Sequence, residues 1–194
     1  QNLDNNPYLI SKFEAEKNIL CAIQKSGLNA NIFRVGNIMP RLKDGVFQKN
    51  AKQNVFLSAL KFNVDYGMIP FDFMSMPLEL SPVDECSDFV FALLKENLNY
   101  TIYHIANSNM ITFSDFKKLL LELGISIKCV DEDNFMQALG KYTNEYTKEY
   151  LLASNLNSFS LDRTVSNLNS IGLHWKPIDI EYIKFILNLL RDKF

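Results

Sequence analysis

Tyr8 and Lys12 are the two residues near the start of the sequence whose types and spacing could do chemistry together. They are four positions apart, so on a helix they would share one face. A phenol has an ordinary pKa of about 10, and a neighbouring ammonium lowers it towards the range in which acid–base catalysis is efficient. The pair therefore suits proton donation to a carbonyl group under reduction, with Lys12 also able to bind a ribose hydroxyl. A surface pair without function has the same spacing, so the surroundings must decide between the two.

The segment around Tyr8 predicts a helix followed by a buried strand. An Asn–Pro pair just before Tyr8 is typical of a helix start, and the helix is expected over 7–25. An apolar strand is expected over 31–35, and it ends at Gly36-Asn37. Because ligands of open α/β sheets bind beyond the carboxyl ends of strands, Gly36 and Asn37 lie where a ligand is expected.

The rest of the chain is predicted to be mainly helical, with two further strands. Helical periodicity and capping residues predict helices over 47–66, 84–95, 112–124, 131–139, 150–156, 162–171 and 180–192. Short apolar runs predict strands over 101–105 and 125–130, and the apolar stretch 71–76 predicts either a lid or the wall of an acyl tunnel.

Composition narrows the class of protein. The net charge of −2 gives no electrostatic case for nucleic acid or an anionic membrane, and no apolar run approaches the ~20 residues of a membrane span. Three distant cysteines (Cys21, Cys86 and Cys129) predict buried free thiols in a reducing, cytoplasmic setting, with no spacing typical of a metal site. The seven glycines contain no GxGxxG motif, so this chain has no visible phosphate cradle.

Several stretches together resemble one family. PYLISKFEAE (7–16) is similar to the PYxxSKxxAE signature of extended short-chain dehydrogenases/reductases. FRVGNIMPR (33–41) and DGVFQKN (44–50) resemble the terminal thioester reductase domains of nonribosomal peptide synthetases, relatives of the reductase domains of carboxylic acid and aminoadipate reductases. Further similarities are ELSPVD (79–84), YHIAN (103–107) and a tail over 164–175.

This resemblance implies an α/β fold: the C-terminal fragment of an extended short-chain reductase. Residues 1–45 would be the remnant of the Rossmann NAD(P)-binding domain, its last helix–strand unit, and 46–194 a mainly helical α+β substrate-binding lobe. The parent domain would use NADPH to reduce an acyl or peptidyl thioester on a phosphopantetheinyl carrier protein, releasing an aldehyde or an alcohol. Its glycine-rich turn and the Ser or Thr of its catalytic triad would lie upstream of Gln1, so this chain alone is expected to be inactive.

The resemblance also implies roles for particular residues. They are Tyr8 and Lys12 as catalytic residues, Lys12, Val35, Gly36 and Asn37 at the cofactor, and Arg41 and Gln48 at the substrate. The family often has Pro where this chain has Val35, which puts that cofactor contact in doubt. A simple turn at Gly36-Asn37 and a solvated loop arginine at Arg41 are the alternatives.

Other residues favour structural interpretations. Arg34 is expected to pair with an acid, Asp84 to cap a helix and His104 to pack in a strand. Two other functions stay open: the C-terminal half of another extended short-chain reductase or epimerase, against which the FQKN stretch argues, and a non-catalytic lobe that docks a carrier protein. An exposed sheet edge would favour association in either case.

Overall fold

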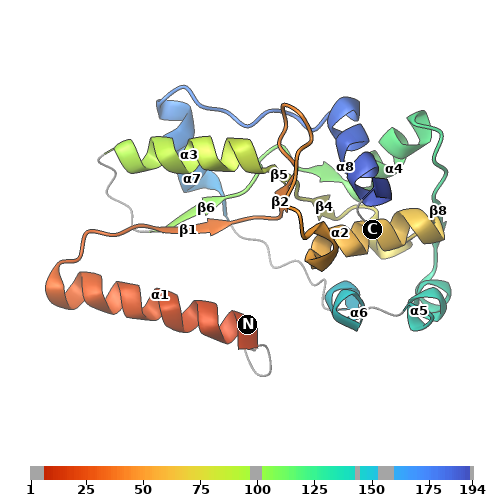
Figure 1. Ribbon diagram of the computed structural model, residues 1–194, viewed down its shortest axis with the longest axis horizontal. Helices are drawn as coiled ribbons and strands as arrows, with labels where there is room; N and C mark the ends of the chain where they lie inside the picture. The colour runs from red at the N-terminus through yellow and green to blue at the C-terminus, as the bar shows by residue number, and fades with distance from the viewer. Residues whose placement is uncertain (1–6, 97–101, 143–144, 153–159, 193–194) are drawn as a thin grey trace.

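The computed structural model describes residues 7–96, 102–142, 145–152 and 160–192, and it shows helices around short pairs of strands (Figure 1). The helices are α1 (Pro7–Ser26), α2 (Val55–Tyr66), α3 (Val83–Lys95), α4 (Phe113–Glu122), α5 (Glu132–Gly140), α6 (Glu145–Leu152), α7 (Asp162–Ser170) and α8 (Ile180–Asp192), with 3₁₀ turns at Ala51–Gln53 and Phe71–Phe73. The strands are β1 (Ile32–Val35), β2 (Ile38–Met39), β3 (Met68–Pro70), β4 (Pro77–Leu78), β5 (Ser81–Pro82), β6 (Ile102–Ile105), β7 (Ile111–Thr112) and β8 (Lys128–Val130). The predicted α/β fold class is confirmed.

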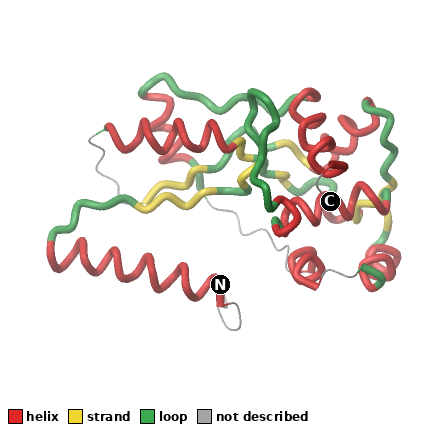
Figure 2. Tube along the Cα trace, viewed as in Figure 1, coloured by secondary structure: helices red, strands yellow, loops and turns green. Residues whose placement is uncertain are grey.

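The strands pair across long stretches of sequence. β1 lies parallel to β6, with Ile32 opposite Ile102 and Val35 opposite Ile105. The pairs β2–β5 and β3–β8 are also parallel, whereas β4–β7 is antiparallel. Figure 2 shows β1 and β6 between helices that are labelled in Figure 1, with α3 and α7 on one side of the pair and α1 on the other. The carboxyl end of β1, where a ligand is expected, therefore lies beside the carboxyl end of β6.

Local sequence explains most helix boundaries. Thr112 and Asp115 form a capping box at α4, and the Asp131 side chain caps α5 by accepting from the Asn134 amide, as predicted from these residue types. Gly67 ends α2 in the left-handed conformation, with φ of 61°.

Several predicted boundaries were wrong. The helix predicted over 47–66 begins only at Val55, because the Asn54 side chain accepts from the Leu57 amide and caps it there. The helix predicted over 150–156 starts earlier: α6 begins at Glu145, with Thr147 and Leu151 buried. The predicted strand over 125–130 shortens to β8. The asparagine cap before Pro7, the start of the strand at 101 and the end of the helix at 153–156 lie outside the described residues.

Three apolar clusters form the core, and α1 belongs to none of them. The largest cluster contains α2, α4 and α8 residues such as Leu60, Phe116 and Ile186. A second packs Tyr103 of β6 with Phe89 and Trp175, and a third centres on Phe62 of α2 between α5 and α6.

The helix α1 has no buried residue in the described structure. On its apolar stripe, Ala15 is exposed and Ile19, Ala22 and Ile23 are half-buried. None of the helices in the described ranges combines the length and the apolar character that crossing a bilayer requires.

Candidate active site

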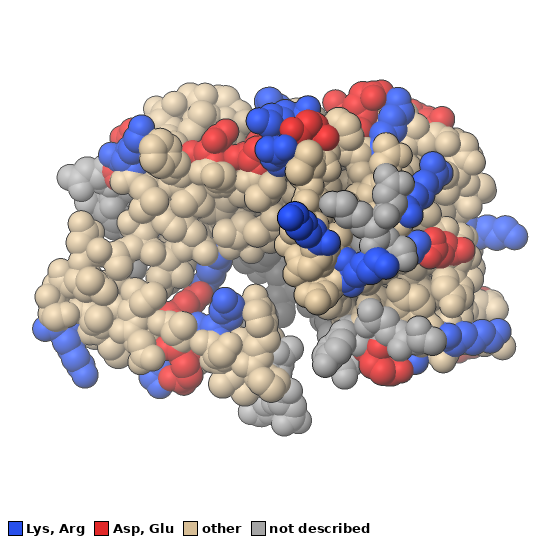
Figure 3. Space-filling view, in the orientation of Figure 1, with Lys and Arg blue, Asp and Glu red and all other residues tan. Residues whose placement is uncertain are grey.

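Tyr8 and Lys12 lie in the first two turns of α1 and share one face of the helix. The Lys12 Nζ atom is 5.4 Å from the centroid of the Tyr8 ring, which is the close approach that the spacing predicts. The Tyr8 side chain is 67% exposed. Figure 3 shows a hollow between α1 and the rest of the molecule, so there is open space beside this helix.

One ion pair ties α1 to the strand β1. The Arg34 guanidinium donates to both carboxylate oxygens of Glu16, from Nε at 2.9 Å and from Nη2 at 2.6 Å. The hydrogen bond from Arg34 lowers the pKa of the Glu16 carboxyl. The expectation that Arg34 pairs with an acid is thus confirmed. As α1 runs back along β1, its first turn and the carboxyl end of β1 lie towards the same side (Figure 1).

The carboxyl end of β1 is held by a half-buried carboxylate, that of Glu79. The Gly36 amide donates to the Ile105 carbonyl at 2.9 Å, and the next amide, that of Asn37, donates to Glu79. A Cβ atom on Gly36 would come within 2.5–2.8 Å of the Glu79 carboxyl group, so a larger residue at position 36 would displace Glu79. The glycine is therefore needed for close packing as well as for the strand exit.

Glu79 also fixes two further segments. Its carboxylate accepts from the Ser81 hydroxyl and, at 3.3 Å, from the Asn107 amide that follows β6. Asn107 in turn donates from Nδ2 to the Leu80 carbonyl at 3.1 Å. Burial raises the pKa of Glu79, and the hydrogen bonds that it accepts oppose part of this rise.

Sequence reasoning noticed the ELSPVD stretch but gave Glu79 no role. The available signal was a single acidic residue within the otherwise uncharged stretch 73–83. An acid in such a setting is expected to be hydrogen-bonded. Only one partner of Glu79 in the described structure, Ser81, is near in sequence, whereas Asn37 and Asn107 lie 42 and 28 positions away.

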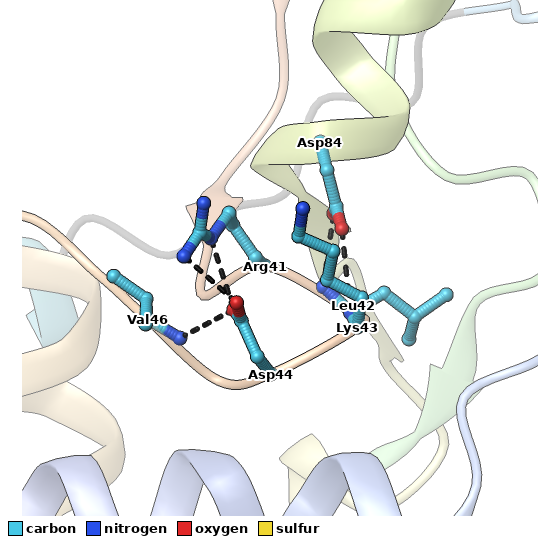
Figure 4. Close-up of polar contacts among 6 residues, drawn as sticks. All are labelled: Arg41, Leu42, Lys43, Asp44, Val46 and Asp84. Carbon is cyan, nitrogen blue, oxygen red and sulfur yellow. Dashed lines mark hydrogen bonds and ion pairs between the residues drawn. The ribbon is translucent and has the colours of Figure 1, made fainter.

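In the loop after β2, the Arg41 side chain pairs with an acid of the same loop. Arg41 forms a two-pronged ion pair with Asp44, at 2.9 and 2.8 Å, and Asp44 also accepts from the Val46 amide (Figure 4). This favours the interpretation of Arg41 as a loop arginine. The predicted substrate-binding residue Gln48 is exposed, next to the buried Phe47.

Asp84 has a role other than the predicted helix cap. Pro82 occupies the N-cap position of α3, and the Asp84 carboxylate instead accepts from the amides of Leu42 at 2.9 Å and Lys43 at 3.3 Å (Figure 4). The carboxylate thus anchors the same loop that the Arg41–Asp44 pair closes. The sequence does not distinguish the two roles, because an aspartate near the start of a helix is typical of a helix cap and can equally bind the amides of a distant loop.

The cysteines and acidic residues offer no metal centre within the described part of the chain. All three cysteines are free thiols, but only Cys86 is buried, and the prediction of three buried thiols was wrong for the exposed Cys21 and the half-buried Cys129. Burial raises the pKa of the Cys86 thiol to about 12, so this thiol is not a nucleophile near neutral pH.

The residues present fit only one end of a nicotinamide dinucleotide. Val35, the last residue of β1, is 40% exposed and could offer an apolar surface to a ring. Lys12 could donate to a ribose hydroxyl. The chain has no glycine-rich turn for the pyrophosphate, so phosphate binding would need residues outside it.

Comparisons with known proteins agree with the resemblance that the sequence motifs indicated. An NAD-binding family model described as Male sterility protein matches residues 1–90. No curated protein sequence gives a significant match.

Solved structures match nearly the whole chain. A thiolation-reductase di-domain from an archaeal non-ribosomal peptide synthetase is 32% identical with a TM-score of 0.79, over 97% of this chain and 41% of that chain. The reductase domain of the aureusimine biosynthetic cluster is 24% identical with a TM-score of 0.84, over 96% and 51%. The terminal R domain of the myxalamid PKS-NRPS pathway is 20% identical with a TM-score of 0.76, over 95% and 49%.

This chain therefore spans about half, or less, of the chains that it matches. Its first 90 residues match the NAD-binding family described as Male sterility protein, and its fold is that of the nonribosomal peptide synthetase reductase domains that it matches, as the resemblance implied.

Proposed function

We propose that this chain is part of an NAD(P)H-dependent thioester reductase that releases a carrier-protein-bound acyl or peptidyl group as an aldehyde, or after a second reduction as an alcohol. The nicotinamide would supply a hydride to the thioester carbonyl carbon. Tyr8 would give its proton to the carbonyl oxygen, and Lys12 would favour the phenolate left behind. Loss of the thiol of the carrier arm then leaves the aldehyde.

The observation that carries this proposal is the Tyr8–Lys12 pair itself. The ammonium lies 5.4 Å from the phenol ring, on an exposed face beside a hollow, where a substrate carbonyl could reach it.

A second observation supports an enzyme larger than this chain. Among the described residues β1 pairs only with β6, and Leu9, Ile10 and Phe13 of α1 are exposed. Parallel strands usually belong to larger sheets that are covered on both faces. We infer that a Rossmann half pairs with the open edge of β1 and covers α1, that 1–45 completes that half, and that 46–194 is the substrate lobe.

The cofactor and partner are inferred in the same way. NADPH is proposed as the hydride source on the resemblance alone. A phosphopantetheinyl carrier protein is proposed as the partner because one similar structure contains a thiolation domain beside its reductase domain.

Cofactor binding tests the division of the enzyme. The 194-residue chain is expected to bind NADPH very weakly or not at all, because it has no cradle for the pyrophosphate. Fluorescence titration measures this, and micromolar affinity would contradict the proposed division.

Activity tests the role of Tyr8. In the complete reductase domain, with an acyl-pantetheine thioester as substrate, Tyr8→Phe is expected to lower the rate of NADPH oxidation by about 10²–10⁴-fold. Tyr66→Phe, which changes a partly exposed tyrosine on α2, is the matched control and should leave the rate unchanged.

Persistence of activity in Tyr8→Phe would remove Tyr8 from the mechanism. A complete domain that binds a carrier protein but oxidises no NADPH would favour the alternative of a non-catalytic docking lobe. Turnover of nucleotide sugars in place of thioesters would favour an epimerase.

A further inference from the structure

A small cavity opens inside the substrate lobe, next to the network at the end of β1. Its volume is about 50 Å³, and most of its wall is apolar, from α2, from the segment 73–79 and from α6. Asn37 and Glu79 line it too, so the cavity borders the strand end at which the nicotinamide is expected.

Asn63 of α2 is the unusual residue in this wall. Its side chain is 1% exposed, and its Oδ1 atom has no hydrogen-bond partner among the described residues. By contrast, the buried Asn107 uses both ends of its amide, donating to Leu80 and accepting from Asn109. Buried acceptors are nearly always paired with protein groups or ordered water. Because Asn63 lines the cavity, a hydrogen-bond donor held in the cavity would supply the partner that its Oδ1 atom lacks.

The size and polarity of the cavity define the group that would fit. One water-sized group needs about 10–15 Å³ of such volume, so the cavity holds roughly three to five non-hydrogen atoms. A neutral donor suits it better than an ammonium, because a buried cation needs a free counter-charge. Glu79 is the carboxylate that lines the cavity, and it already accepts from Asn37, Ser81 and Asn107.

We propose that this cavity receives the short side chain of the acyl group, and that Asn63 selects a side chain that carries a neutral hydrogen-bond donor such as a hydroxyl. The inference rests on the proposed thioester reductase function and names the substrate class for it. Asn63 thereby determines specificity, whereas Tyr8 acts on the carbonyl.

A matched pair of substrates tests the proposal in the complete reductase domain. N-acetyl-threonyl-pantetheine and N-acetyl-valyl-pantetheine have the same shape but differ by a hydroxyl in place of a methyl group. The wild type is expected to prefer the threonyl substrate by about tenfold or more in kcat/KM, because the valyl substrate leaves Asn63 unpaired. Asn63→Leu should abolish or reverse this preference.

Stability separates selection from a structural role. Asn63→Leu removes an unpaired polar group and should leave the melting temperature of the unliganded protein unchanged or higher. A large fall would mean that Asn63 supports the fold and would overturn the proposal.

A second variant tests the cavity without changing Asn63. Ala59, a small buried residue in the same wall, can be changed to Val to reduce the space. Ala59→Val should lower kcat/KM for both aminoacyl substrates but not for acetyl-pantetheine, and equal effects on all three would place the side chain elsewhere. If the wild type and Asn63→Leu both show the same kcat/KM for the threonyl and valyl substrates, the inference about Asn63 is overturned but the proposed function is not. Reduction of none of these thioesters would instead remove the proposed function.

Discussion

Helices α1 and α2 both carry large apolar side chains, but only α2 buries them within this chain. α1 is 20 residues long and has no buried residue, whereas the 12-residue α2 has six. Phe13 of α1 is 50% exposed, and Phe62 of α2 is fully buried. The apolar residues of α1 therefore do not pack into the core described here. This supports the inference that another part of the enzyme covers them.

The largest expected effect comes from truncating the same residue type in the two helices. Phe62→Ala should lower the free energy of unfolding of this chain by about 3–5 kcal/mol, because removal of the ring leaves a cavity beside Phe135 and Leu139. Phe13→Ala should change it by no more than about 0.5 kcal/mol. Urea denaturation of both variants measures the difference, and similar losses would show that α1 is packed in solution.

In the complete domain the difference in destabilisation between Phe62→Ala and Phe13→Ala should become smaller. If a Rossmann half covers α1, Phe13→Ala becomes a core substitution there and should destabilise by about 2 kcal/mol or more. An unchanged stability in the larger protein would mean that α1 stays exposed.

A smaller effect is expected at Glu79, which fixes the boundary between the two regions. Glu79→Gln should lower the free energy of unfolding by about 1–3 kcal/mol at pH 4, because an amide nitrogen carries two hydrogens and would meet the donating amide of Asn37 or Asn107, whereas a protonated carboxyl carries one hydrogen, which the Ser81 hydroxyl oxygen can accept. Burial raises the pKa of Glu79, so the folded state favours the protonated form. The wild type therefore loses stability relative to Glu79→Gln as pH rises above 4.5, the ordinary value.

Denaturation at a series of pH values checks this sign. Glu132→Gln, at an exposed acid in the first turn of α5, is the control and should lack the trend. A difference between wild type and Glu79→Gln that grows with rising pH would contradict the stated direction of the pKa shift.

The smallest effect on stability is expected at the ion pair that attaches α1. The Arg34 and Glu16 side chains are 48% and 23% exposed, so the pair is worth at most about 1 kcal/mol after screening by solvent. Arg34→Gln should nevertheless increase hydrogen exchange throughout α1, because the pair joins this helix to β1. Lys184→Gln, which breaks an exposed pair within α8, should leave exchange in α1 unchanged.

Much of the fold could be predicted because its signals are local. A capping threonine, a capping aspartate and a glycine that adopts positive φ act within four residues, so Thr112, Asp131 and Gly67 mark helix ends wherever the helices lie. The Asp84 anchor was missed because its partners, the amides of Leu42 and Lys43, lie about forty positions earlier.

The sequence by itself determined the Tyr8–Lys12 pair, since four positions on a helix fix their common face. It also determined the strand that leads to Gly36. By contrast, the packing of Glu79 against Gly36 and the place of Asn63 in the wall of a cavity depend on the three-dimensional fold. The physical reason is distance along the chain: a buried carboxylate or amide needs partners, and nothing in the neighbouring residues says which distant backbone amides or cavities will supply them.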